Sequence, residues 1–258
     1  MGEIRNVLLD LDGVLYERDE AIGGAAEALA FLEERRIPFL LVTNVTRMPV
    51  SGIVKKLAGF GLRVPPERIL SALSATVDYC SSKKPGATCF LIAPDSAGAE
   101  FEAAGLRVTR NEEPADFVVV GYDTRTDFGM LDSAFRLLER GAELIAMHED
   151  KRLPGKPSIG LGAFVKALEY STGKRAAIIG KPSTTFFRLA LEKIGGKAGE
   201  TAMVGDSLSS DILGAKNAGM RTVLVKTGNF NEAELRASKT KPDFIIDSIL
   251  GLPGLLQA

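Results

Sequence analysis

The sequence predicts an α/β fold built on a parallel sheet, because two kinds of segment alternate along it. Short apolar runs, NVLLD (residues 6–10) and PFLLVTN (38–44), alternate with segments whose apolar residues recur at helical spacing, GAAEALAFLEERR (24–36) and PVSGIVKKLAGFG (49–61). Strands that are apolar at successive positions and separated by helices are typical of parallel sheets. The 258 residues, 45% of them hydrophobic, suffice for one large domain or two smaller ones.

The same alternation returns near the C-terminal end of the sequence. We predict strand, helix, strand, helix, strand and strand over RAAIIG (175–180), TTFFRLALEKIG (184–195), TAMVGD (201–206), LSSDILGAKNAG (208–219), RTVLVKTG (221–228) and DFIID (243–247). Together with the N-terminal elements, these segments are expected to form one α/β domain that comprises residues 1–70 and 176–258.

The middle of the sequence, residues 71–175, is predicted to be a second α/β domain inserted into the first. Its apolar runs and helical segments alternate in the same way, but its strands do not end in carboxylates as the flanking strands do: ATCFLIAP, EFEAAG, LRVTR, DFVVVGY, MLDSAFRLLERG and AELIAM. The expected boundaries lie near VPPERI and STGKR, which combine proline or glycine with charge.

Composition and charge exclude several classes of function. Lys and Arg number 32 and Asp and Glu 33, so no basic field recruits nucleic acid or an anionic membrane. The apolar runs are strand-sized, and the N-terminal segment lacks the features of a signal peptide. The 2 cysteines make no disulfide framework, so we expect a cytoplasmic protein. A Cys/His zinc site is not expected, since His148 is the one histidine.

Two pairs of aspartates stand where predicted strands end. Asp10 and Asp12 in DLDG are two positions apart, and Asp206 and Asp211 lie in GDSLSSD, the latter in the first turn of a helix. Taken singly, these residues are compatible with a turn, a helix cap and a favourable helix dipole. Those interpretations do not explain why two distant strands present carboxylates at the edge where parallel sheets bind ligands. Carboxylates, water and substrate phosphate are ligands that Mg²⁺ prefers, so we predict a Mg²⁺ site there.

Two further strand ends offer groups for phosphate. In LVTN, the Thr43 hydroxyl and the Asn44 backbone N–H stand just before a helix and can hold phosphate oxygens. In GKP, Lys181 ends a predicted strand and is a point charge suited to phosphate. Each of these signals is weak alone, because Thr-Asn is common turn chemistry and lysines reach the surface from many strand ends.

In this order, the motifs DLDGVLY, LVTN, GKP and GDSLSSD resemble the four motifs of the haloacid dehalogenase (HAD) superfamily phosphatases, over essentially the whole chain. The resemblance implies a Rossmann-like HAD core with a parallel sheet and an inserted α/β cap domain of the C2 type. DLDGVLY, GKPSTTFF and GDSLSSDILGAKNAGM resemble class IIA, the branch of NagD and 4-nitrophenylphosphatase. IAMHEDKRL and GLGAFVKALEY are most similar to the subgroup of haloacid dehalogenase-like hydrolase domain-containing protein 2, with the phospholysine phosphohistidine inorganic pyrophosphate phosphatase as a neighbour.

The resemblance also assigns roles to residues. Asp10 is expected to be the nucleophile that forms an aspartyl-phosphate, and Asp12 the general acid and base. Mg²⁺ is expected to bind Asp10, the backbone carbonyl of Asp12, Asp206 and the substrate phosphate. The phosphoryl group is expected to contact Thr43, Asn44 and Lys181, while Asp211 orients Lys181 or a metal-bound water. Because haloacid dehalogenases lack the second aspartate of DLDG, Asp12 favours a phosphatase.

The expected activity is hydrolysis of a small phosphorylated metabolite. The alternatives are a non-hydrolytic protein that binds a phosphate ligand or a partner, and a phosphotransferase or mutase whose closed cap excludes water. In the inserted domain, His148 and Glu149 are candidates for substrate selection, and a solvated charged loop is an equal alternative. Arg47 is expected on the surface rather than in the pocket. The resemblance allows a homodimer, which no feature of the sequence compels.

Overall fold

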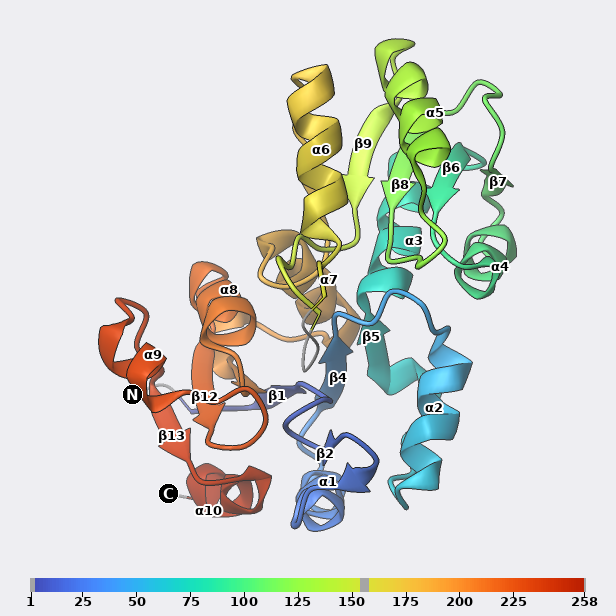
Figure 1. Ribbon diagram of the computed structural model, residues 1–258. Helices are drawn as coiled ribbons and strands as arrows, with labels where there is room; N and C mark the ends of the chain where they lie inside the picture. The colour runs from blue at the N-terminus through green and yellow to red at the C-terminus, as the bar shows by residue number, and fades with distance from the viewer. Residues whose placement is uncertain (1–2, 154–157, 258) are drawn as a thin grey trace. The chain divides into compact units, whose positions relative to one another are not determined.

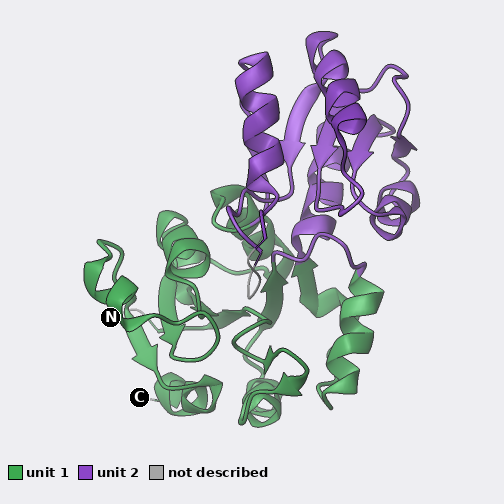
Figure 2. Ribbon diagram, in the orientation of Figure 1, with its two compact units in different colours: residues 1–43, 50–70, 181–258 green, residues 44–49, 71–180 purple. Residues whose placement is uncertain are grey.

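The computed structural model describes residues 3–153 and 158–257, and the chain divides into two compact units. Unit 1 comprises Met1–Thr43, Val50–Leu70 and Lys181–Ala258, and unit 2 comprises Asn44–Pro49 and Ser71–Gly180 (Figure 2). Each unit has its own sheet, so each is described by itself.

Unit 1 is built on a six-stranded sheet with strand order β13-β12-β11-β1-β4-β5 (Figure 1). The pairings that join β13, β12, β11, β1 and β4 are parallel. The central strands are apolar at successive positions because helices cover both faces of the sheet. The strands are β1 (Asn6–Leu9), β4 (Phe39–Thr43), β5 (Ile69–Ser71), β11 (Thr201–Gly205), β12 (Arg221–Val225) and β13 (Phe244–Ile246).

The longer helices of unit 1, α1, α2 and α7, each bury one face. In α7, Phe186, Phe187 and Ala190 are buried, the Ser183 hydroxyl caps the first turn, and the left-handed Gly195 ends the helix. The helices are α1 (Ala25–Glu34), α2 (Val50–Gly59), α7 (Thr184–Ile194), α8 (Leu213–Asn217), α9 (Glu232–Ala237) and α10 (Leu252–Gln257). Shorter elements are the hairpin β2 (Tyr16–Glu17) and β3 (Glu20–Ala21) and the turns η1 (Pro66–Arg68), η2 (Ala198–Glu200), η3 (Leu208–Ile212) and η4 (Ile249–Gly251).

Unit 2 has a five-stranded sheet of order β10-β9-β8-β6-β7 in which every pairing is parallel. A capping box between Ser71 and Ser74 starts α3 (Ala72–Lys83), and Asp127 caps α5 (Phe128–Glu139), which packs against α6 (Gly162–Thr172). The elements are α3 (Ala72–Lys83), β6 (Thr88–Ile92), α4 (Asp95–Ala103), β7 (Arg107–Thr109), β8 (Phe117–Val120), α5 (Phe128–Glu139), β9 (Glu143–Ala146), α6 (Gly162–Thr172) and β10 (Ala177–Ile178).

The predicted α/β fold with parallel sheets is confirmed, and one expected strand belongs to the other sheet. The strand expected over 175–180 is the two-residue β10, which pairs with β9 in unit 2 and not with the sheet of unit 1. The helix expected over 208–219 begins with a π-helical turn, η3, before α8. No helix in the described parts of the chain combines the length and the apolar character that a bilayer crossing needs.

Candidate active site

Two aspartates meet at the carboxyl end of the sheet in unit 1. Asp10 directly follows β1, and Asp206 directly follows β11. The two strands are parallel neighbours, with Leu9 opposite Val204, and the Asp10 N–H donates to the Val204 carbonyl at 2.9 Å. The next residue of each strand therefore emerges at the same edge, which brings the two carboxylates side by side.

A buried lysine joins this pair to a third aspartate. The Lys181 Nζ lies 2.8 Å from Asp10 Oδ1 and 2.8 Å from Asp211 Oδ1, and it donates to the Val42 carbonyl at 3.4 Å. Lys181 is 2% exposed and Asp211 is 0% exposed. A buried ammonium is tolerated only with close compensation, which the two carboxylates provide.

The π-helical turn η3 positions Asp211. The Ser207 hydroxyl accepts the Ser210 N–H at the start of the turn, and the Ser207 N–H donates to Asp211 Oδ2 at 3.2 Å. Single π-helical turns are frequent at functional sites. Here the turn carries the Asp211 carboxylate, which lies beside Lys181.

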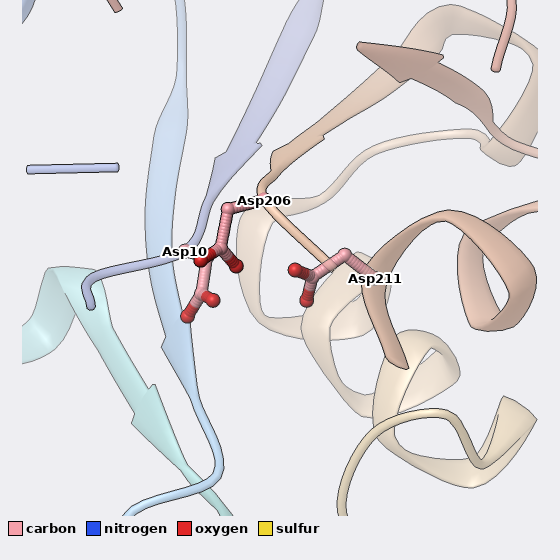
Figure 3. A group of neighbouring side chains, drawn as sticks. All are labelled: Asp10, Asp206 and Asp211. Carbon is pink, nitrogen blue, oxygen red and sulfur yellow. The ribbon is translucent and has the colours of Figure 1, made fainter. Parts of the chain in front are cut away.

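Three carboxylates of this site could hold a cation. One oxygen each of Asp10, Asp206 and Asp211 lie within 4.8 Å of one another, and their carboxyl groups point toward a common region (Figure 3). Burial raises the pKa of Asp10 well above its usual value against the opposing effect of Lys181, and Asp211 and Asp206 raise it further. Burial, with the Asp211 charge, raises the pKa of Asp206 to about 7. An all-oxygen donor set whose negative charges outnumber the lysine fits a hard divalent cation such as Mg²⁺.

Asp12 lies outside this group of carboxylates and is exposed. It sits in a turn closed by the Gly13 N–H, which donates to the Tyr16 carbonyl at 2.7 Å. Partial burial raises the pKa of Asp12, and the Lys56 charge opposes that change. The Lys56 Nζ is itself held 4.0 Å from the centroid of the Tyr16 ring. An exposed carboxyl with a raised pKa is suited to exchanging a proton with a bound substrate and with water.

The remaining predicted site residues fall in different places. Thr43 is the buried last residue of β4, the neighbour of β1, and so belongs to the same sheet edge as Asp10. Asn44 is half-buried and begins unit 2. In unit 2, the buried His148 accepts the Asp150 N–H on its Nδ1 at 3.2 Å, and burial lowers the pKa of His148 against the effect of Asp150.

Two other residues of unit 2 have partners within that unit. Glu149 pairs with Lys166 at 2.8 Å. The Arg47 guanidinium lies 5.2 Å from the centroid of the Tyr122 ring, and Arg47 is exposed as expected. A role of His148 and Glu149 in substrate selection stays a prediction.

Sequence reasoning missed two residues that contact the site. Asn229 donates twice to Asp206, and the Thr227 hydroxyl donates to the Gly13 carbonyl. A signal was present, because RTVLVKTG reads as a strand of the same parallel sheet, so the loop after it must emerge at the same edge as Asp10 and Asp206.

Comparisons with known proteins show which family the chain belongs to. A profile of haloacid dehalogenase-like hydrolases matches residues 7–107, and a HAD-hydrolase-like profile matches residues 178–252. An acid sugar phosphatase of Staphylococcus epidermidis is 33% identical over 247 residues, which cover 95% of each chain. The chain belongs to the phosphatases of the haloacid dehalogenase-like hydrolase family.

Solved structures of this phosphatase family are similar to the chain over nearly its whole length. A 4-nitrophenylphosphatase from Thermotoga maritima matches with a TM-score of 0.92 and 32% identity, covering 98% of both chains. NagD from E. coli K-12 matches with a TM-score of 0.89 and 29% identity, covering 96% of this chain and 98% of that one. These matches are consistent with the expected class IIA membership, and the finer subgroup stays a prediction.

Proposed function

We propose that this phosphatase hydrolyses small phosphomonoesters with the help of Mg²⁺ through an aspartyl-phosphate on Asp10. The observation that carries the proposal is the position of Asp10, a buried carboxylate at the ligand-binding edge of a parallel sheet, in contact with Lys181 and beside Asp206. A carboxylate held in this way is oriented for attack, and a cation beside it can receive the charge of a phosphoryl group.

In the first step, an Asp10 oxygen attacks the substrate phosphorus, and the bond between phosphorus and the ester oxygen breaks. Asp12 donates its proton to the leaving oxygen, for which its raised pKa and its exposure are suitable. In the second step, Asp12 takes a proton from water, the water oxygen attacks phosphorus, and the Asp10 carboxylate is released with inorganic phosphate. The nucleophile is kept in place throughout by the Leu11 N–H, which donates to Asp10 Oδ1 at 2.8 Å.

Lys181 is assigned to the transferring phosphoryl group. It is anchored between Asp10 and Asp211, so its position is fixed before substrate binds. The Thr43 hydroxyl and the Asn44 N–H are proposed to hold phosphate oxygens. Mg²⁺ would be held by Asp10, Asp206 and the Asp12 carbonyl, and when bound it neutralises charge on carboxylate and phosphate oxygens.

The proposed class of substrate follows from the names of the relatives, and its selection is assigned to unit 2. The relatives named above are an acid sugar phosphatase and a 4-nitrophenylphosphatase, which makes sugar phosphates and aryl phosphates the first compounds to test. We propose that unit 2 acts as a C2-type cap and selects among these substrates, with His148 and Glu149 among the residues involved. Comparing the substrate ranking of wild type with that of Glu149→Ala tests this assignment, and an unchanged ranking would contradict it.

The proposed chemistry is tested by phosphate release from 4-nitrophenyl phosphate and a panel of sugar phosphates. Three samples are compared: wild type with Mg²⁺, wild type with EDTA, and Asp10→Asn with Mg²⁺. Turnover in the first sample alone supports a metal-dependent mechanism on Asp10. Equal turnover in Asp10→Asn would place the chemistry at another residue. If none of the three samples releases phosphate although the protein is folded, ligand binding or phosphoryl transfer to another acceptor would be favoured.

A further inference from the structure

We propose that residues 227–229, the loop after β12, form a clamp that orients Asp206 for metal binding, with Asn229 as its positioning residue. The inference rests on the proposed Mg²⁺ site and adds to it a part of the chain that lies outside the four motifs. The loop belongs to unit 1, like Asp10 and Asp206.

Both donors of Asn229 are directed at the same oxygen. The Asn229 backbone N–H lies 2.7 Å from Asp206 Oδ2, and the Asn229 Nδ2 lies 3.0 Å from it. Two hydrogen bonds to one oxygen fix the rotation of the carboxylate plane as well as its position. Because Oδ2 already accepts these two donors, Oδ1 is the Asp206 oxygen that would remain for a cation.

The carboxylate is also enclosed by two glycines. A Cβ added to Gly13 or to Gly228 would overlap Asp206 Oδ2, and it would also crowd the Cα of the other glycine. Both glycines have positive φ angles, 81° and 62°, which other residues adopt with strain. Backbone from two separate loops therefore packs against one oxygen of Asp206.

A third contact joins the two loops directly. The Thr227 hydroxyl donates to the Gly13 carbonyl at 2.5 Å. The turn that carries Asp12 is therefore bonded to the loop that carries Asn229, and Asp206 lies between the two. Mg²⁺ requires near-ideal octahedral geometry, so a carboxylate fixed in advance should bind it more tightly than one that rotates.

The first test compares two asparagines of the same segment. Asn229→Ala removes the side-chain donor and keeps the backbone one, so we expect Mg²⁺ affinity about 10-fold weaker, at the lower end of the effect of such supporting residues. Because Asn229 is exposed, the substitution leaves no cavity in the core and the variant should fold. In the control, Asn231→Ala removes the cap of α9, which accepts the N–H groups of Ala233 and Glu234; the melting temperature should fall while Mg²⁺ affinity is unchanged.

Affinity is measured by calorimetric titration of each metal-free protein with Mg²⁺, without substrate. Turnover is then measured against Mg²⁺ concentration, and Asn229→Ala should shift the half-saturating Mg²⁺ concentration more than the rate at saturation. Thr227→Val, which lacks the hydroxyl, should also weaken Mg²⁺ binding, and Thr227→Ser, which keeps it, should restore wild-type affinity.

The outcomes separate the clamp from the proposed function. If wild type binds Mg²⁺ and hydrolyses phosphomonoesters while Asn229→Ala binds Mg²⁺ equally well, the clamp is refuted and the proposed function stands. Equal weakening in Asn229→Ala and Asn231→Ala would refute a specific role of Asn229 and indicate a general loss of loop structure. If wild type binds no Mg²⁺, the metal-dependent function and the clamp both fall.

Discussion

Replacing Asp206 by Asn should stabilise the metal-free protein at neutral and alkaline pH. Asp206 is 2% exposed, and its burial together with the Asp211 charge raises its pKa to about 7 from the usual 3.8. An Asn side chain has nearly the same shape and keeps an oxygen that can accept from Asn229, but it carries no charge. The substitution therefore removes a buried charge with little change in packing.

The sign follows from proton linkage. The folded-state pKa of Asp206 lies above the unfolded value, so folded protein holds this proton more tightly and is most stable at low pH. As pH rises from 3.8 to about 7, the unfolded chain releases the proton first, and the free energy of unfolding falls. Above that range the free energy of unfolding stays at this lower value, because both states have released the proton. Asp206→Asn has no such proton, so its advantage over wild type must grow with pH.

The magnitude follows from the two pKa values. Each pKa unit corresponds to about 1.4 kcal/mol, so the rise in pKa from 3.8 to about 7 lowers the free energy of unfolding of wild type by about 4 kcal/mol at pH 8. Asp206→Asn should be more stable than wild type by that amount at pH 8, and by about 1 kcal/mol at pH 4.5. Mg²⁺ at 100 times its dissociation constant should stabilise wild type by about 2.7 kcal/mol and leave Asp206→Asn unaffected, which narrows the gap.

The measurement is urea unfolding followed by circular dichroism at pH 4.5, 6 and 8, with a chelator and then with Mg²⁺. Asp243→Asn is a control of opposite sign. Against the effect of its partial burial, hydrogen bonds from Thr222 and contact with Lys216 lower the pKa of Asp243, so its loss should destabilise the protein at pH 8. A gap between Asp206→Asn and wild type that does not change with pH, or a variant less stable than wild type at pH 8, would refute the reasoning.

Three further substitutions test other parts of the site. Asp12→Asn should lower turnover by about 10²- to 10⁴-fold and leave Mg²⁺ binding in calorimetry unchanged; near-normal turnover would remove Asp12 from the proton transfers. Lys181→Met leaves its carboxylate neighbours buried without compensation and should lower the free energy of unfolding by about 3–5 kcal/mol at pH 8; urea unfolding without a change would contradict this. Gly228→Ala places a Cβ against Asp206 Oδ2 and should weaken Mg²⁺ binding in calorimetry, whereas unchanged affinity would mean that the loop moves away freely.

Much of the fold could be predicted, because parallel α/β sheets leave a strong local pattern. The buried strands β1, β4 and β11 are apolar at successive positions, and the helices between them have a clear period. The strand over 175–180 shows where this reasoning fails. An apolar run indicates a buried strand but not which sheet it joins, since that is decided by pairing with residues such as Ile145, far away in the sequence.

The site shows the same limit in another form. Asp10 and Asp206 are predictable from sequence because two distant strands of one parallel sheet both end in carboxylates, and such strand ends share one edge. Asn229 gave no comparable signal, because Gly-Asn after a strand is ordinary turn chemistry. Its contact with Asp206 depends on two hydrogen bonds, one of them from the backbone, and a backbone donor is invisible in the residue types.

The charge of Asp206 lowers the stability of the metal-free protein but is needed to bind the cation, and substitutions can separate these two effects. Removing the charge, as in Asp206→Asn, should stabilise the metal-free protein and abolish binding of the cation.

Removing a donor to that charge, as in Asn229→Ala, should have a different effect, because the hydrogen bonds from Asn229 lower the pKa of Asp206 against the effects of burial and Asp211. Without the side-chain donor the carboxylate is harder to ionise in the fold, so stability at pH 8 and Mg²⁺ affinity should fall together. Stability and affinity therefore change in opposite directions when the charge is removed and in the same direction when its support is removed. A general loosening of the loop would weaken Mg²⁺ binding without making the loss of stability depend on pH.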